Sequence, residues 1–319
     1  MEERSIGIDI GGTKIAAGLV NQDGEVVCKK IYPTPKESSQ MVLECIKEIV
    51  TRSTLYAEKE GIKLVGVGIG SAGQVDYKAG KILSGTDNIK DWNDIHIYNF
   101  LKRYTDLPIW LDNDANTFAI AEYALGNAKG TEDLICLTLG TGVGGGVISN
   151  GRMVRGKWGG AAELGHITVD MNGPACNCGS NGCLEVYASG TGIANRMREK
   201  LSRTDVSSYT ENPNLLTSKE VFQLYDQGLP LAKETIDQAI QALSYGIVSL
   251  IHTFNPSVVV LGGGLVKERD WIAKAIKNSI QDKGMTSLIR SVDIVISNLG
   301  YDAGLIGAAY QAWFHKKVD

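Results

Sequence analysis

The sequence lacks any uninterrupted apolar run close to the ~20 residues that a membrane span needs, so no membrane partner is expected. It also lacks a block rich in lysine or arginine, and its net charge is −4, which argues against a nucleic-acid partner. Residues 1–4 show neither the basic nor the apolar region of a signal peptide, which favours the cytoplasm. With 319 residues, 43% of them hydrophobic, the chain can bury a large core, and we expect two lobes.

Glycine is the residue in excess, with 38 positions in the chain against ~7% in an average protein. The excess gathers in clusters that follow apolar stretches, at 11–12, 140–146, 159–160 and 262–264. Each cluster alone could be an ordinary tight turn. Together, at the ends of expected strands, they favour backbone that lies close to a ligand.

Strand patterns and helix patterns alternate along the chain, which predicts an α/β fold. An apolar strand over 5–10, a Gly/Thr turn and a returning strand over 15–20 open the sequence. Residues 134–139, another Gly/Thr turn and residues 144–148 repeat this design. The repeat predicts two related lobes that each begin with a hairpin.

The two Gly/Thr turns are candidate phosphate loops. No G-x-x-x-x-G-K-[ST] motif is present, and the G-x-G-x-x-G match at 140–145 runs into a strand pattern where a dinucleotide fold would begin a helix. Backbone amides of such turns can bind anions, and Thr13 and Thr141 can add hydroxyl donors. Asp9 lies in an apolar strand just before the first turn. Because a buried carboxylate needs a partner, we expect Mg²⁺, directly or through water, or turn amides beside it.

Four polar residues crowd into the five positions from Asp112 to Asn116, between an expected strand and an expected helix. A helix start favours Asp and Asn as caps, but one cap needs only one such residue. A carboxylate here could instead accept the proton of a hydroxyl nucleophile.

Six cysteines fall into two groups. Cys28, Cys45 and Cys136 are scattered in apolar surroundings and are expected to be reduced core residues. The others lie within eight residues of one another and follow a histidine in the pattern H-x9-C-x-C-x4-C, formed by His166, Cys176, Cys178 and Cys183. Three thiolates and one imidazole are the ligand set of a structural Zn²⁺ site.

Two segments carry a resemblance to a known family. Residues 8–14 resemble the first phosphate motif of sugar kinases in the actin/hexokinase superfamily. Residues 139–147, followed by Gly156, Gly165 and His166 at suitable spacing, resemble the signature of the ROK family (repressor, open reading frame, kinase). The resemblance runs from residue 5 to the final helix.

This resemblance implies two ribonuclease-H-like lobes with ATP and a sugar in the cleft between them. Residues 1–125 and 303–319 would form the small lobe, and residues 126–302 the large lobe. The region from Cys176 to Ser189 is most similar to bacterial glucokinases of the family, which implies transfer of the ATP phosphate, with Mg²⁺, to the 6-hydroxyl of glucose.

The resemblance also implies roles for individual residues. The general base would be Asp114. The sugar would contact Gly73, Asn113, Asp114, Glu163, His166 and Glu185. ATP and Mg²⁺ would be held by Asp9, Gly11, Gly12, Thr13, Lys14, Gly140, Thr141, Gly142, Gly262, Gly263 and Gly264. His166 would use one ring nitrogen for zinc and the other for a sugar hydroxyl, and a homodimer or homotetramer is expected.

Alternatives stay open at this stage. Fructose, mannose, allose, N-acetylglucosamine and N-acetylmannosamine kinases share these motifs. ROK repressors share the sugar-binding body but add an N-terminal helix-turn-helix domain, for which no room is expected before Ser5. An oxidoreductase is disfavoured by the strand that follows the glycine motif.

Overall fold

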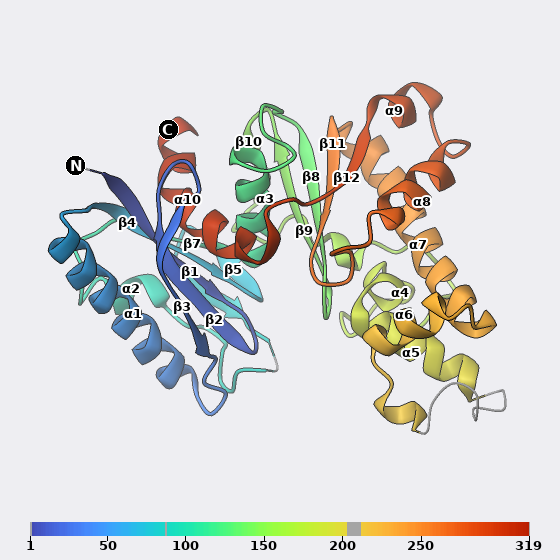
Figure 1. The fold of residues 1–319 in the computed structure, drawn as a ribbon, viewed down its shortest axis with the longest axis horizontal. Coiled ribbons are helices and arrows are strands. Elements are labelled where there is room, and N and C mark those ends of the chain that lie inside the picture. Colours follow the sequence, from blue (N-terminus) through green and yellow to red (C-terminus); the bar gives the residue numbers. More distant parts are fainter. Residues whose placement is uncertain (1, 87, 203–211, 319) are drawn as a thin grey trace. The chain divides into compact units, whose positions relative to one another are not determined.

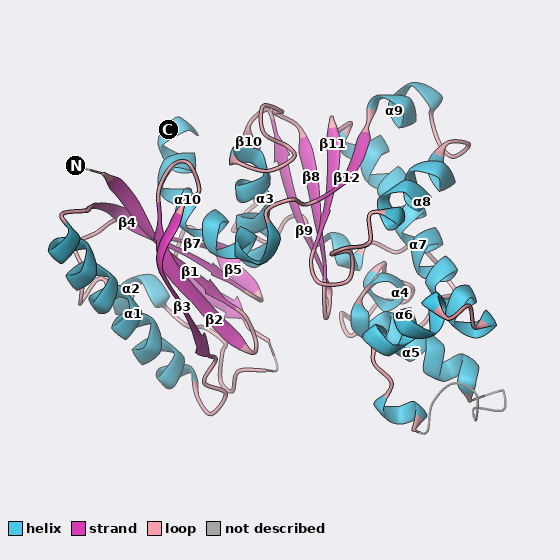
Figure 2. Cartoon of the chain, viewed as in Figure 1, coloured by secondary structure: helices cyan, strands magenta, loops and turns pink. Residues whose placement is uncertain are grey.

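The computed structural model describes residues 2–86, 88–202 and 212–318 of the chain. These residues form two compact units. Unit 1 comprises Met1–Glu132, Gly146–Ala162 and Asn298–Asp319, and unit 2 comprises Asp133–Gly145 and Glu163–Ser297. Helices and strands alternate in both, as Figure 2 shows, so the fold is α/β as the sequence predicts.

The sheet of unit 1 has five strands in the order β3-β2-β1-β4-β7. Strand β2 is antiparallel to its neighbours β1 and β3, whereas β4 and β7 run parallel to β1. Their bounds are β1 Glu3–Ile10, β2 Lys14–Val20, β3 Val26–Pro33, β4 Lys63–Ser71 and β7 Ile109–Asn113. A small two-stranded sheet follows β4, formed by β5 Gln74–Asp76 and β6 Lys81–Ser84.

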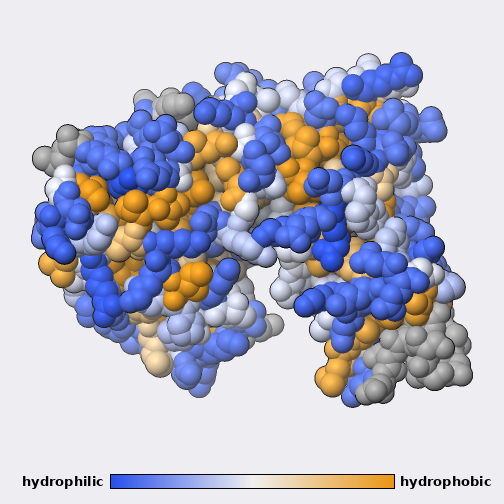
Figure 3. Space-filling view, viewed as in Figure 1, coloured by the Kyte–Doolittle hydropathy of each residue, from blue (hydrophilic) through white to orange (hydrophobic). Residues whose placement is uncertain are grey.

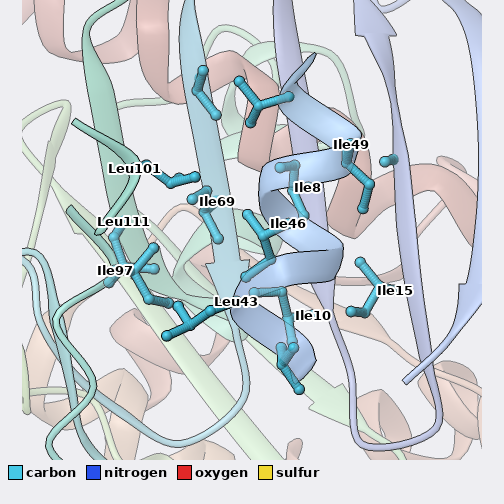
Figure 4. Close-up of a cluster of buried hydrophobic side chains, with 14 of the residues drawn as sticks. Ile8, Ile10, Ile15, Leu43, Ile46, Ile49, Ile69, Ile97, Leu101 and Leu111 are labelled. Carbon is cyan, nitrogen blue, oxygen red and sulfur yellow. The ribbon is translucent and has the colours of Figure 1, made fainter. Parts of the chain in front are cut away.

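Helices cover both faces of this sheet (Figure 1). On one face, α1 packs its apolar side chains, Ile46 and Ile49 among them, against Ile8 and Ile69 (Figure 4). On the other face α10 comes very close, because β1 and β4 present paired glycines there. A Cβ on Gly68 would lie 1.8 Å from a backbone oxygen of α10. The helices are α1 Ser39–Glu60, α2 Ile97–Leu101, α3 Asp114–Ala124 and α10 Ala303–Val318, with a 3₁₀ turn at Gly300–Asp302.

The second sheet repeats the first, with the order β10-β9-β8-β11-β12. When the five strands of each sheet are numbered along the chain, both sheets have the spatial order 3-2-1-4-5, which is the ribonuclease-H-like order. The internal repeat read in the sequence is therefore a repeat of topology. The strands are β8 Leu134–Leu139, β9 Val143–Ser149, β10 Arg152–Met153, β11 Val258–Gly262 and β12 Asp293–Ile296.

Unit 2 also holds a set of helices around the long α7. This helix begins with Pro230 at its first turn and ends at Asn255, whose φ of 45° is left-handed. The helices are α4 Glu185–Ala188, α5 Gly190–Leu201, α6 Ser218–Asp226, α7 Pro230–Phe254, α8 Trp271–Ile280 and α9 Thr286–Ser291, with 3₁₀ turns at Leu164–His166 and Pro213–Leu215. Among the described residues, no helix combines the length and apolarity that crossing a membrane requires. Figure 3 shows hydrophilic residues over much of the visible face, with hydrophobic patches between them.

The compact units differ in extent from the two lobes expected from the resemblance. Residues 146–162 belong to unit 1, although the expected large lobe included them. Their packing explains this: a Cβ on Gly146 would lie 2.7 Å from the carbonyl oxygen of Ala115 in α3, and Arg155 pairs with Asp112 at the end of β7. Which unit carries which substrate stays a prediction.

Candidate functional site

In unit 1, the first Gly/Thr turn connects β1 to β2 and is held from several sides. The backbone N–H of Gly11 donates to the Lys14 carbonyl at 3.0 Å, and the Thr34 hydroxyl donates to the Gly11 carbonyl at 2.7 Å. A Cβ on Gly12 would lie 2.7 Å from the Asn88 side-chain nitrogen. Thr13 and Lys14 are exposed. The turn is therefore fixed from behind while its tip remains accessible.

Asp9 precedes this turn. Its side chain lies on the face of β1 covered by α10, because a Cβ on Gly304 would come 2.5 Å from a carboxylate oxygen of Asp9. Burial, and to a lesser extent the charge of Asp114, raise the pKa of Asp9 to about 7, although Lys14 opposes the shift. The structure thus brings two of the predicted functional carboxylates together, as expected of a site that receives a cation.

At the start of α3, the helix cap and the predicted catalytic base are two different residues. Asn113 is the N-cap: its side-chain oxygen accepts from the backbone N–H groups of Ala115 at 2.8 Å and Asn116 at 3.3 Å. Asp114 is the first helical residue and is not the cap. Burial raises its pKa, and the hydrogen bond from the backbone N–H of Ala115 partly offsets the shift. A carboxylate with a raised pKa is a stronger base than an ordinary aspartate.

Asn113 also ties this helix start to the predicted substrate residue Gly73. The side-chain nitrogen of Asn113 donates to the Gly73 carbonyl at 2.9 Å. Gly73 has φ of +98°, and a Cβ there would lie 2.4 Å from the Ser84 carbonyl oxygen, so the position requires glycine. The predicted residues of unit 1 therefore form one connected group.

Sequence reasoning did not find Arg155 in this group. Its guanidinium donates to Asp112 through Nε at 2.9 Å and Nη2 at 2.6 Å. The Asp112 side chain is buried, with an exposed fraction of 2%, and that of Arg155 is largely shielded, with an exposed fraction of 10%. Arg155 and Asp112 lie 43 positions apart, so no local sequence pattern links them. The sequence therefore does not distinguish Arg155 from the neighbouring Arg152 and Lys157.

In unit 2, three segments meet at the end of β8. The second Gly/Thr turn is closed by a hydrogen bond from the Gly140 N–H to the Gly142 carbonyl at 3.0 Å. The N–H of Gly190, in the first turn of α5, donates to the Gly140 carbonyl at 2.8 Å. In the loop at 262–264, which is predicted to bind ATP, Gly263 has φ of +91°, and a Cβ there would come 2.3 Å from the Leu139 carbonyl. The structure brings this loop and the second turn together and adds the α5 N-terminus, which sequence reasoning missed.

The predicted metal ligands also converge. One ligand atom from each of four residues lies within 4.8 Å of the others: His166, Cys176, Cys178 and Cys183. The Nδ1 atom of His166 lies 3.6 Å from the sulfur of Cys176, and the sulfurs of Cys178 and Cys183 are 3.5 Å apart. All six cysteines are free; of the three expected in the core, Cys136 is buried, Cys45 is half-buried, and Cys28 is exposed, so the prediction was wrong for Cys28.

These separations fit four ligands around one tetrahedral ion with metal–sulfur bonds of ~2.3 Å. Burial and the neighbouring sulfurs raise the pKa of the Cys183 thiol to about 12, so its thiolate form requires a cation beside it. The donor set therefore fits a bound metal, and Nδ1 is the imidazole nitrogen turned toward it.

Glu185 connects this cluster to the second Gly/Thr turn. It lies two residues after Cys183, and its Oε2 accepts from the backbone N–H of Val143 at 2.8 Å. The predicted sugar residue Glu163 precedes a 3₁₀ turn that ends at His166. This turn packs against Val143, since a Cβ on Gly165 would lie 2.1 Å from the Val143 carbonyl. Thus the predicted sugar, metal and phosphate residues of unit 2 adjoin one another.

Known proteins resemble the chain over nearly its whole length. It is 36% identical over 307 residues to the glucokinase of Thermotoga maritima, covering 95% of each chain. The crystal structure of a ROK hexokinase from Thermus thermophilus matches with 34% identity and a TM-score of 0.84, covering 99% of this chain and 100% of that one. A ROK glucokinase from Streptomyces griseus, solved with glucose and AMPPNP, matches with 33% identity and a TM-score of 0.80, covering 97% and 99%.

Relatives of other function also match. An N-acetylmannosamine kinase of Escherichia fergusonii is 31% identical over 97% of this chain and 98% of that protein. The xylose repressor of Bacillus subtilis is 26% identical over 95% of this chain and 75% of its own length. The family model described as "ROK family" matches residues 5–316. With its two repeated sheets, its paired Gly/Thr turns and this match, the chain belongs to the ROK family.

Proposed function

We propose that this protein is an ATP-dependent hexose kinase that phosphorylates the 6-hydroxyl of glucose. The observation that carries the proposal is the start of α3, where Asn113 caps the helix and Asp114 keeps a buried carboxylate of raised pKa. A sugar hydroxyl is a poor nucleophile, and such a carboxylate can accept its proton as the phosphoryl group transfers. The similarity to glucokinases and hexokinases supports the same activity.

In the proposed reaction, one bond to phosphorus forms, one breaks, and one proton is transferred. The 6-oxygen attacks the γ-phosphorus of ATP, the bond from that phosphorus to the β,γ-bridging oxygen breaks, and the proton passes to Asp114. The products are glucose 6-phosphate and ADP. The backbone amides of the Gly11–Lys14 and Gly140–Gly142 turns bind phosphate oxygens, and Asp9 holds Mg²⁺ directly or through water. Bound Mg²⁺ neutralises charge on the transferring phosphate.

We further propose that the ion at the Cys₃His cluster is Zn²⁺ with a structural role. Bound at Nδ1 of His166, the ion would fix the ring proton on Nε2, so that this N–H is left to donate to a sugar hydroxyl. It also anchors the segment that leads to Glu185. Glu163, which is exposed, supplies a charged acceptor for another hydroxyl.

A coupled assay with ATP across a panel of hexoses tests this function. We expect glucose to be the preferred substrate, with much weaker turnover of N-acetylated hexosamines. An acetamido sugar preferred over glucose would move the protein to the amino-sugar kinases, as the N-acetylmannosamine kinase relative would suggest. Sugar binding without turnover of any hexose would instead favour a regulator of the repressor type.

A further inference from the structure

The strongest feature outside the predicted site residues is the buried ion pair between Arg155 and Asp112. The two oxygens of Asp112 have separate partners. Oδ2 accepts both hydrogen bonds from Arg155, whereas Oδ1 accepts from the Asn113 backbone N–H at 2.9 Å and from the Asn116 side chain at 2.8 Å. Asp112 thereby joins the loop after β10 to the first turn of α3, where the proposed base lies.

Arg155 is itself held firmly. Its guanidinium carbon lies 4.8 Å from the ring centre of Tyr77, a cation–π distance. Its carbonyl accepts from the N–H groups of Gly159 at 3.0 Å and Ala161 at 3.2 Å. Gly159, with φ of +130°, packs so closely that a Cβ would come 2.2 Å from the Val75 carbonyl. The side chain and the backbone of Arg155 are therefore both held in place by closely packed neighbours.

A purely structural ion pair would not need this placement. Asp112 lies near the end of β7, directly before Asn113 and Asp114, and Asn116 lies in the first turn of α3 with Asp114. Loss of the Arg155 bonds would leave Asp112 buried without its cation, and its carboxylate would then move toward solvent or another donor. Asn113, Asn116 and the Asp114 backbone would move with it.

We propose that Arg155 is a positioning residue for the phosphoryl transfer: acting through Asp112, it fixes the Asp114 carboxylate in the geometry for proton abstraction. This inference rests on the proposed kinase function. A misplacement of ~1 Å at a reacting group can lower a rate by about 10²-fold. Arg155→Gln therefore lowers kcat by about 10-fold to 100-fold and changes the KM values for glucose and ATP by less than about threefold.

The matched control is Arg152→Gln, which removes the same charge from an exposed side chain three residues earlier. Its kcat should equal that of the wild type.

Because Asp112 and Arg155 act through one contact, the double variant Asp112→Asn/Arg155→Gln should lose no more turnover than the worse single variant. Added guanidinium should restore part of the kcat lost in Arg155→Ala, which a general loss of stability would not allow.

All kcat values are measured well below the unfolding midpoint of each variant. A folded Arg155→Gln protein that turns over as fast as Arg152→Gln overturns the inference, as does additivity in the double variant. If Arg155→Gln does not fold, Arg155→Lys is the deciding variant. One ammonium group cannot reproduce the two parallel hydrogen bonds of the guanidinium to Asp112, so kcat should fall by at least about threefold. Wild-type turnover of Arg155→Lys would refute the proposal. Absence of hexose phosphorylation in the wild type would refute the proposed function instead.

Discussion

At the scale of single residues, Asp114 should be separable from its neighbours by substitution. Asp114→Asn keeps the size of the side chain but cannot accept a proton. Since a general base contributes about 10²–10⁴-fold, kcat should fall by that much while glucose still binds in isothermal titration calorimetry. Asn113 provides the cap, so helix α3 loses nothing by the change.

Thermal unfolding supplies the control for this variant. Burial raises the pKa of Asp114 in the folded state, so the folded carboxyl binds its proton more tightly than the unfolded one. Stability is therefore lost as pH rises through the window above the ordinary value of 3.8. At neutral pH, Asp114→Asn should unfold at the same temperature or higher. Near-wild-type turnover would refute the base assignment.

The same raised pKa predicts how activity depends on pH. The base works only when ionised, so kcat/KM for glucose should fall with decreasing pH, and the midpoint should lie above 3.8. Circular dichroism at each pH would confirm that the protein remains folded. A kcat/KM that stays constant down to about pH 4 would contradict a base in this buried position.

At the scale of elements, the contact between Glu185 and the second Gly/Thr turn can be tested through Gly142. A Cβ on Gly142 would lie 2.5 Å from Oε2 of Glu185, the atom that accepts from Val143. Gly142→Ala should displace this carboxylate and raise the KM values for glucose and ATP together. Gly140→Ala provides the comparison, because a Cβ there meets no atom within 4 Å. Equal effects of the two variants on glucose KM would argue against a role for the Glu185 contact.

Periodicity and turn residues were sufficient to predict the elements themselves. The hairpins at 5–20 and 134–148 and their repetition follow from local patterns. Contacts between distant segments could not be predicted in this way. The Arg155–Asp112 pair, the α5 N-terminus beside Gly140 and the packing of residues 146–162 on α3 depend on tertiary structure alone. The metal cluster was predictable because its chemistry requires four particular side chains.

At the scale of the whole molecule, the proposed zinc belongs to one unit, since all four ligands lie in unit 2. Chelation should increase hydrogen–deuterium exchange in peptides covering 163–188 and leave exchange in β1 and β4 of unit 1 unchanged. Cys178→Ser should have the same effect without chelator and should weaken glucose binding. Cys28→Ser, at an exposed cysteine outside the cluster, is the matched control. An equal increase throughout both units, or none, would contradict a structural ion at this place.

The two units also differ in how much of the chain must be synthesised before each is complete. Unit 2 is complete once Ser297 is made, whereas unit 1 needs residues 298–319, including α10, whose close approach to β1 and β4 depends on Gly7 and Gly68. On the ribosome, the sheet of unit 1, although made first, therefore exposes the face that α10 will cover until the last residues of the chain have been made. A nascent chain stalled before Ala303 should thus leave the glycines of β1 and β4 and the Asp9 carboxylate uncovered, even though every strand of its sheet has already been synthesised.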